Sequence, residues 1–186
     1  MINDRSSKLQ MKKNLFVYFV DALNKWNKEI NPTSSSTYSK LQLQKLLFLA
    51  SAINADKNNH EMLDMFNDFY ALPYGPVEMD IYEAMNSNTL KCIKVSDRYC
   101  RYTEPTDTKL FLSIPKNLRD IVDVSIKSLK QNKVNYFSIS PFELVEITHK
   151  WSAWKDAYAI ATLFGSKQEP MPIKAIIESK FKSFNL

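Results

Sequence analysis

The scarcity of glycine limits the folds open to this chain more than any other feature of its sequence. Only two glycines, Gly75 and Gly165, occur among its 186 residues. A β-sandwich or a glycine-rich nucleotide-binding fold normally needs more of them, because its turns and phosphate loops require backbone conformations that a β-carbon disfavours. The sequence therefore favours a fold built mainly from helices.

The composition is that of a globular protein. Hydrophobic residues make up 45% of the chain, aromatic residues 12% and charged residues 24%, so the chain can bury a sizeable core. Its length fits one domain, and we expect residues 1–186 to form a single compact unit. No stretch approaches 18 apolar residues and the polar N-terminus lacks a signal-peptide core, so we expect no membrane contact and a cytoplasmic location.

The formal net charge is +5, from 25 Lys and Arg against 20 Asp and Glu. This charge permits contact with nucleic acid but does not demand it. The positive residues are spread over many segments. The densest short run, Lys8 with Lys12 and Lys13, lies near the N-terminus, where solubility is a sufficient explanation.

Apolar residues recur at intervals of three and four along several segments, which is the spacing of one helix face. Ser39 can cap one of these helices, whose broad apolar surface predicts burial on most sides. Ser140, Pro141 and Glu143 show the pattern of a capping box with proline at the first helical position. The predicted helices cover residues 11–28, 39–54, 115–131, 140–149, 154–161 and 172–181.

The apolar period changes between Leu90 and Leu112. Short β-rich runs at 92–95, 99–103 and 109–112 predict a small antiparallel β-meander near residues 91–112. The small polar residues at 33–37 predict a loop. The predicted fold class is therefore α+β, mainly α: a compact helical domain with one small β-meander.

The segment around Gly75 predicts a turn followed by a helix. Residues 66–72 are aromatic-rich and read as extended, although a helix beginning at Glu61 is an alternative. Gly75 supplies the turn, and Pro76 fits the first position of a helix to about Asn86. The expected inner face of that helix consists of Val77, Ile81, Tyr82 and Met85.

Residues that could carry catalysis or hold a metal ion are few. The two histidines, His60 and His149, lie neither in a nucleophile motif nor at metal-ligand spacing, and the sequence contains no phosphate loop or dinucleotide fingerprint. Cys92 and Cys100 are too far apart for a C-x-x-C motif; we expect free thiols, although a cross-strand disulfide is geometrically possible. We therefore predict no catalytic residue, no cofactor and no metal site.

Two aromatic positions have competing interpretations. His149 lies one helical turn from Glu146 and beside Trp151 and Trp154, so it could carry a proton, but we favour a hydrogen bond that fixes the following turn. Tyr74 is either an exposed anchor for a partner or a ring that packs the turn against the preceding helix, and we favour the packed ring.

Two polar residues lie inside the apolar helix over residues 39–54. Gln44 and Lys45 would be costly there if buried without partners. They either reach solvent along a narrow free edge or pair with the Gly75 turn. Leu43 belongs to a leucine stripe at helical spacing and is expected in the core.

Three sequence blocks carry a further pattern. They are Leu43-Gln44-Lys45-Leu46-Leu47-Phe48-x-Ala50, then Phe69-x-Ala71 with Tyr74-Gly75-Pro76-Val77 and Tyr82, then Thr148-His149 with Trp154 and Ala157. In this order and spacing the blocks resemble the Panacea domain family. The resemblance covers about residues 39–160, and we expect the N-terminal and C-terminal helices to pack on this part.

The resemblance implies an antitoxin of a bacterial or phage toxin-antitoxin system that neutralises a cognate protein toxin by direct contact. SocA-like relatives act as adaptors that deliver a toxin to a protease, so a protease is a second implied partner. On this interpretation the motif residues maintain the scaffold, with the Gly75 turn as a joint, and variable surfaces choose the toxin.

Two other functions compete with the antitoxin interpretation. The net charge and the consecutive helices over residues 142–149 and 154–161 suggest a nucleic-acid-binding regulator of a mobile element. An enzyme that uses His149 with Glu146 or Asp156 would require a pocket that holds these groups together.

Overall fold

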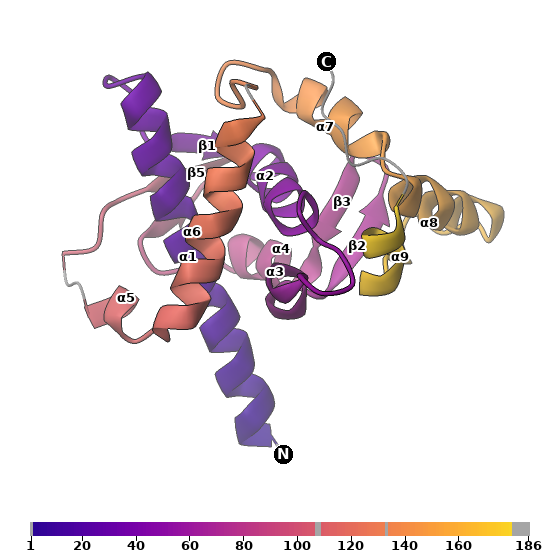
Figure 1. Cartoon of the computed structure of the whole chain (residues 1–186), viewed down its shortest axis with the longest axis horizontal. Helices are drawn as coiled ribbons and strands as arrows, with labels where there is room; N and C mark the ends of the chain where they lie inside the picture. The colour runs from indigo at the N-terminus through magenta and orange to yellow at the C-terminus, as the bar shows by residue number, and fades with distance from the viewer. Residues whose placement is uncertain (1, 107–108, 133, 180–186) are drawn as a thin grey trace.

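The computed structural model describes residues 2–106, 109–132 and 134–179. Helices make up most of this part of the chain, as Figure 1 shows. Their bounds are α1 (Ile2–Ile30), α2 (Lys40–Ala52), α3 (Glu61–Met65), α4 (Met79–Asn86), α5 (Lys109–Leu112), α6 (Lys116–Gln131), α7 (Pro141–His149), α8 (Ser152–Leu163) and α9 (Ile173–Glu178).

The described residues also form two antiparallel sheets of three strands each. The first sheet, in the order β1-β5-β4, contains β1 (Thr37–Ser39), β4 (Ile93–Val95) and β5 (Tyr99–Tyr102). The second, in the order β3-β2-β6, contains β2 (Phe69–Leu72), β3 (Gly75–Glu78) and β6 (Glu169–Pro170). These elements confirm the predicted α+β, mainly α fold class.

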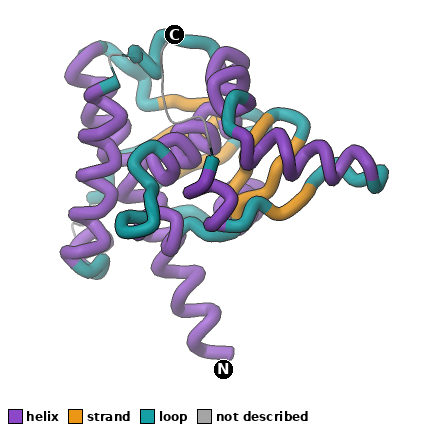
Figure 2. The backbone as a smooth tube through the Cα atoms, turned by 45° about the vertical axis from the view of Figure 1, so that its right-hand side comes forward, coloured by secondary structure: helices purple, strands orange, loops and turns teal. Residues whose placement is uncertain are grey.

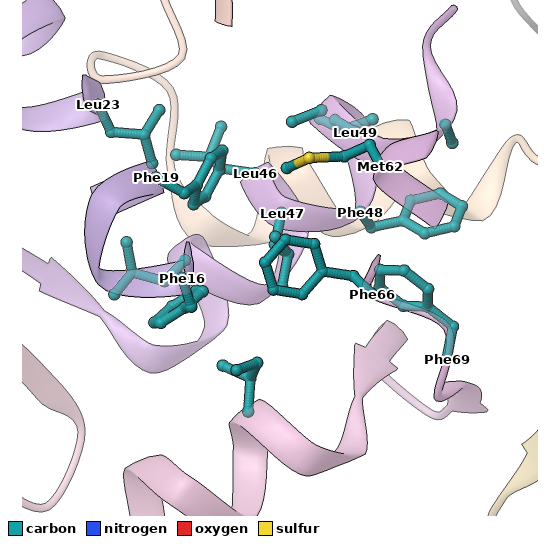
Figure 3. Close-up of a cluster of buried hydrophobic side chains, with 14 of the residues drawn as sticks. Phe16, Phe19, Leu23, Leu46, Leu47, Phe48, Leu49, Met62, Phe66 and Phe69 are labelled. Atoms are coloured by element: carbon teal, nitrogen blue, oxygen red, sulfur yellow. The ribbon is translucent and has the colours of Figure 1, made fainter. Parts of the chain in front are cut away.

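Helix α2 lies at the centre of the molecule, with α1 and α6 on one side and the β2–β3 hairpin on the other (Figure 1). Its residues from Leu43 to Ala52 are all buried, as its broad apolar surface predicts. Figure 3 shows part of the buried cluster. The predicted stripe of α1 belongs to the same cluster: Leu15, Phe16, Phe19, Val20, Leu23 and Trp26. Each such side chain contributes about 1.5–3 kcal/mol when fully buried.

Two helices extend beyond this packed body. In Figures 1 and 2 the N-terminal end of α1 and the far end of α8 both project away from the other elements. At the end of α8, Leu163 and Phe164 are each 79% exposed.

Local start signals fix several helix ends where the sequence places them. The Ser39 hydroxyl accepts a hydrogen bond from the Gln42 amide at 2.9 Å at the start of α2. Ser140 and Glu143 form the complete capping box of α7. The predicted start of the first helix at residue 11 is wrong, since α1 already begins at Ile2. The last predicted helix is confirmed as far as Glu178, and its end at residue 181 lies outside the described residues.

The prediction of a third β-strand at residues 109–112 is wrong. These residues form α5, and a run of only three apolar residues, Leu110 to Leu112, fits a helical turn as well as a strand. The third strand is β1, from the segment predicted as a loop; its Thr37 and Ser39 pair with Arg101 and Tyr99. Between these two residues the ring of Tyr38 is buried, and its hydroxyl donates to Asn24 Oδ1 at 3.2 Å.

The prediction of a helix beginning at Pro76 is also wrong. Pro76 lies in β3, where its missing amide hydrogen falls on the edge that does not face β2. Helix α4 begins three residues later and is capped by Glu78, whose Oε2 accepts from the Ile81 amide at 2.9 Å. The two interpretations of the preceding segment both hold, because a short helix, α3, leads into strand β2.

Candidate protein-binding groove and its buried support

The edge of β3 that does not face β2 is closed by two side chains from α2. The Gln44 side chain accepts from the Glu78 amide at 2.9 Å and donates to the Glu78 carbonyl at 3.4 Å. The Lys45 ammonium donates to the Pro76 carbonyl at 2.7 Å. Gln44 and Lys45 thus take the place of a neighbouring strand, and of the two alternatives for them, pairing with the hairpin is the one observed.

Lys45 is fully buried, and it is an unusual residue for such a position. No ion pair to it exists among the described residues, and burial lowers the pKa of its ammonium to about 7. A single hydrogen bond to a carbonyl suffices for a neutral amine but leaves a charged one poorly solvated. Lys45 therefore donates to the hairpin increasingly as a neutral amine as pH rises above 7.

Gly75 allows the hairpin to pack against α7. Gly75 directly follows the turn residues Pro73 and Tyr74, and its φ of +89° lies in the region that residues with a β-carbon rarely adopt. A β-carbon on Gly75 would lie 2.7 Å from Thr148 Oγ1 and 3.0 Å from Lys45 Cε. Both side chains are fully buried, so neither can move aside easily.

Trp154 holds the other end of the turn. Its indole Nε1 donates to the Leu72 carbonyl at 3.0 Å. The rings of His149 and Tyr158 stack on its ring, with centroid distances of 3.6 and 5.2 Å. The favoured prediction for His149, a hydrogen bond that fixes the following turn, is wrong: its Nε2 is buried with no hydrogen-bond partner among the described residues, and the ring contributes by stacking.

An ion pair between distant segments anchors the base of the hairpin. Glu78 is fully buried, and its Oε1 lies 2.7 Å from the Lys12 ammonium of α1. Lys12 also contacts Asp80. Burial alone would lower the pKa of Lys12, but the two carboxylates outweigh this effect and raise it. The prediction that Lys12 serves solubility is therefore wrong, since Lys12 is only 7% exposed.

On its outer side the hairpin borders an apolar groove of about 500 Å³. Five segments line it: the start of α2, the hairpin, α4, the β4–β5 turn and the start of α7. Gln44 and Val77 line it from the buried side, so the residues that fix the hairpin also shape the groove. Its other lining residues include Leu41, Leu72, Pro73, Tyr74, Tyr82, Arg98, Tyr99, Pro141 and Phe142.

Three of the lining aromatic rings are exposed. Tyr74 is 62% exposed, Tyr99 57% and Phe142 66%. The rings of Tyr74 and Phe142 lie edge to face, 6.5 Å apart at 73°. The favoured interpretation of Tyr74 as a packed ring is therefore wrong, and the alternative of an exposed ring is the one observed. Exposed aromatic side chains around an apolar groove are typical of protein-binding sites.

Cys92 and Cys100 are free thiols, as predicted. In residues 2–106, 109–132 and 134–179, no three His, Cys, Asp or Glu side chains are placed to hold a metal ion.

Burial lowers the pKa of His149, an effect that Glu146 opposes, and the lowered pKa favours the neutral ring. No helix in the described part combines the length and the apolar character that a membrane crossing requires.

Comparison with known families identifies the chain. The family model "Antitoxin SocA-like, Panacea domain" matches residues 43–155. The chain belongs to this family. The match begins at Leu43 in α2 and ends just after Trp154, so it includes the hairpin and every contact to it from α2, α7 and α8 described above. Neither the curated proteins nor the solved structures contained a match to the chain.

The motif residues of this Panacea domain occupy two connected places. Those that fix the hairpin are buried: Lys45, Gly75, Pro76, Thr148 and Trp154. Those that line the groove are Gln44, Tyr74, Val77 and Tyr82. Leu43 lies in the core, and His149 is stacked behind Trp154.

Several residues of the site lie outside the motif blocks, among them Lys12, Glu78, Tyr99 and Phe142. Phe142 directly follows the helix-capping Ser140-Pro141 pair and so lies in the first turn of α7. This position is the one local signal that could have indicated an exposed ring. The pairing of Lys12 with Glu78 joins positions 66 residues apart, which no local pattern reveals.

Proposed function

We propose that this Panacea domain neutralises a cognate protein toxin by direct contact, and that the toxin docks in the apolar groove beside the β2–β3 hairpin. The observation that carries the proposal is the groove itself, whose exposed rings of Tyr74, Tyr99 and Phe142 stand on a buried, hydrogen-bonded support. Rigid aromatic anchors of this kind lose little conformational entropy on binding. The role is that of a binding module and not of an enzyme.

The family supports a toxin as the partner, since its description is that of an antitoxin. Toxin and antitoxin would meet in the cytoplasm. Recognition there requires a surface that differs from one antitoxin to the next, and the groove meets this need: its rim combines motif residues with the non-motif residues Tyr99 and Phe142.

Co-expression with the product of the neighbouring gene tests the proposal. We expect the intact chain to restore growth and to co-purify with that product. The double variant Tyr74→Ser/Phe142→Ser should lose both effects while it keeps the wild-type melting temperature. The control, Leu163→Ser/Phe164→Ser, removes apolar side chains that are even more exposed, at the end of α8, and should behave as wild type. Absence of rescue by the intact chain, or equal loss in both double variants, would contradict the proposal.

The same cells distinguish blockade from delivery to a protease. If the chain only blocks the toxin, the toxin level on immunoblots stays constant or rises when the antitoxin is induced. If it acts as an adaptor, the toxin half-life shortens, and the half-life recovers in a strain that lacks the protease.

A further inference from the structure

The outer face of the β1-β5-β4 sheet carries an unusual charge arrangement. Lys94 on β4 and Arg101 on β5 lie directly opposite each other in the strand register, and both are exposed. Thr37 of β1 is the partner of Arg101 on its other side. Like charges in directly opposed positions destabilise a sheet, so folding does not account for this pair.

No carboxylate balances the two charges within the sheet. The strands contain no Asp or Glu, and neither Lys94 nor Arg101 forms an ion pair with another described residue. A third basic residue, Arg98, lies in the β4–β5 turn. Its side chain is 3.6 Å from Asp97, but this ion pair is weak because both side chains are more than 80% exposed.

Lys94, Arg101 and Arg98 form a basic row that borders the apolar groove. Tyr99 projects from the same face of β5 as Arg101, two residues away, and both Tyr99 and Arg98 line the groove. Two residues along a strand correspond to roughly 7 Å. A partner segment whose bulky side chain enters the groove beside Tyr99 can therefore reach Arg101 and Lys94 two to four residues later.

We infer that the groove and the basic row form one recognition surface for a protein segment in which a bulky apolar residue is followed, two to four positions later, by Asp or Glu. This inference rests on the proposed function and specifies the partner segment. Arginine matches carboxylates with two parallel hydrogen bonds, and exposed charges around an apolar contact mainly select the partner and speed its association.

The groove favours a protein segment over nucleic acid. Bases bind single-stranded sites by stacking flat on aromatic faces. Here Tyr74 and Phe142 lie edge to face at 73°, and the aliphatic side chains of Leu41, Leu72 and Val77 line the groove between polar and charged residues at its rim. Such a lining fits a side chain better than it fits a stack of bases.

Selection from a random peptide library displayed on phage, with the full chain immobilised, tests the inference. We expect wild-type protein to enrich peptides with a bulky apolar residue followed by Asp or Glu. The charge-reversed variant Lys94→Glu/Arg101→Glu should instead enrich Lys or Arg at the same positions. Enrichment of apolar peptides without an acidic bias, or the same preference from both proteins, would overturn the inference.

Fluorescence anisotropy with one selected peptide measures the contribution of the charges. The variant Lys94→Gln/Arg101→Gln should weaken the affinity roughly three- to tenfold, and less at high salt. The control Lys127→Gln/Lys155→Gln removes the same charge from exposed positions on α6 and α8 and should leave the affinity unchanged. Equal losses in both variants would reduce the effect to net charge and overturn the inference.

Two further measurements separate the remaining outcomes. Tight, salt-dependent binding of a labelled oligonucleotide that is lost in Lys94→Gln/Arg101→Gln, without selection of acidic peptides, would assign the face to nucleic acid and overturn the inference. A toxin whose binding needs Tyr74 and Phe142 but not Lys94 or Arg101 would also overturn it and leave the proposed function intact. Selection of acidic peptides by a chain that binds no toxin would retain the peptide preference and remove the proposed function.

Discussion

The two sides of the β2–β3 hairpin differ in almost every physical property. On the inner side, Lys45 is fully buried and bonded to the Pro76 carbonyl, and Thr148 packs against Gly75. On the outer side, Tyr74 is 62% exposed and faces the groove. The inner contacts determine where the hairpin lies, and the outer side chains are free to meet a partner.

The contrast separates two kinds of motif residue that a sequence comparison merges. Substitutions on the inner side should lower the free energy of unfolding and affect binding only because the fold is lost. Substitutions on the outer side should affect binding and leave the free energy of unfolding nearly unchanged. Any residue that breaks this division would show that support and recognition are not separate here.

The largest loss of stability is expected for Glu78→Ala. Its removal leaves the Lys12 ammonium buried with Asp80 and Asn67 alone, and it deprives α4 of its cap at the Ile81 amide. A lost helix cap costs about 0.5–2 kcal/mol and a lost hydrogen bond to a buried charge about 1.5–3 kcal/mol, so a total of about 2–5 kcal/mol is expected. Urea denaturation followed by circular dichroism measures this loss. The control Glu83→Ala, an exposed carboxylate on the same helix, should change the free energy of unfolding by less than about 0.5 kcal/mol.

Gly75→Ala is expected to cost about 2–4 kcal/mol, from the positive φ and from the contact 2.7 Å from Thr148 Oγ1. The double variant Gly75→Ala/Thr148→Ala lacks that oxygen. Its loss of stability should therefore be about 1 kcal/mol smaller than the sum of the losses of the two single variants. The chain provides its own control: a β-carbon on Gly165, at φ +69°, meets nothing within 4 Å. Additive losses, or an equal cost for Gly165→Ala, would contradict the packing of Gly75 on Thr148.

Lys45 should make stability depend on pH. Its pKa falls from 10.5 in the unfolded chain to about 7 in the fold, so the unfolded state binds more protons in between. The free energy of unfolding should therefore rise from pH 7 to pH 9, by roughly 2 kcal/mol, and be lost again as pH falls. Burial also lowers the pKa of His149, which moves its titration further away from this window.

Urea denaturation at several pH values compares wild type with Lys45→Met. The methionine keeps the length and apolar character of the stem but cannot be protonated. Its free energy of unfolding should be nearly constant between pH 7 and pH 9. An equal slope in both proteins would show that Lys45 is charged in the fold and that the support of the hairpin is ionic.

Features specified by neighbouring residues could be predicted from the sequence. The capping box of Ser140 needs contacts only three residues apart, and the burial of α2 follows from its apolar periodicity. The pairing of Gln44 and Lys45 with the hairpin was one of two alternatives, because unpaired polar groups inside an apolar helix are costly. The β-rich run at residues 99–103 also predicted strand β5, in which Cys100 is buried.

Features that depend on distant segments could not be predicted. Pro76 fits the first position of a helix and also the free edge of a strand, and only the presence of α2 along that edge decides between them. Thr37 forms a strand because β5 lies beside it, and its polar neighbours alone indicate a loop. The exposure of the Tyr74 ring depends on the groove beside it, and five segments from distant parts of the sequence form that groove.

The smallest change in stability is expected on the outer side. Tyr74→Ser should alter the free energy of unfolding by no more than about 0.5 kcal/mol, because the ring is 62% exposed and packs edge to face with Phe142, which is itself exposed. Lys94→Gln should even stabilise the fold slightly, by roughly 0.2–1 kcal/mol, since it relieves the repulsion from Arg101. Thermal melting of the two variants, measured beside their toxin and peptide binding, tests the division directly. A large fall in melting temperature for Tyr74→Ser would place the ring in the support of the hairpin, and the groove would then be a product of packing and not a surface kept open for a partner.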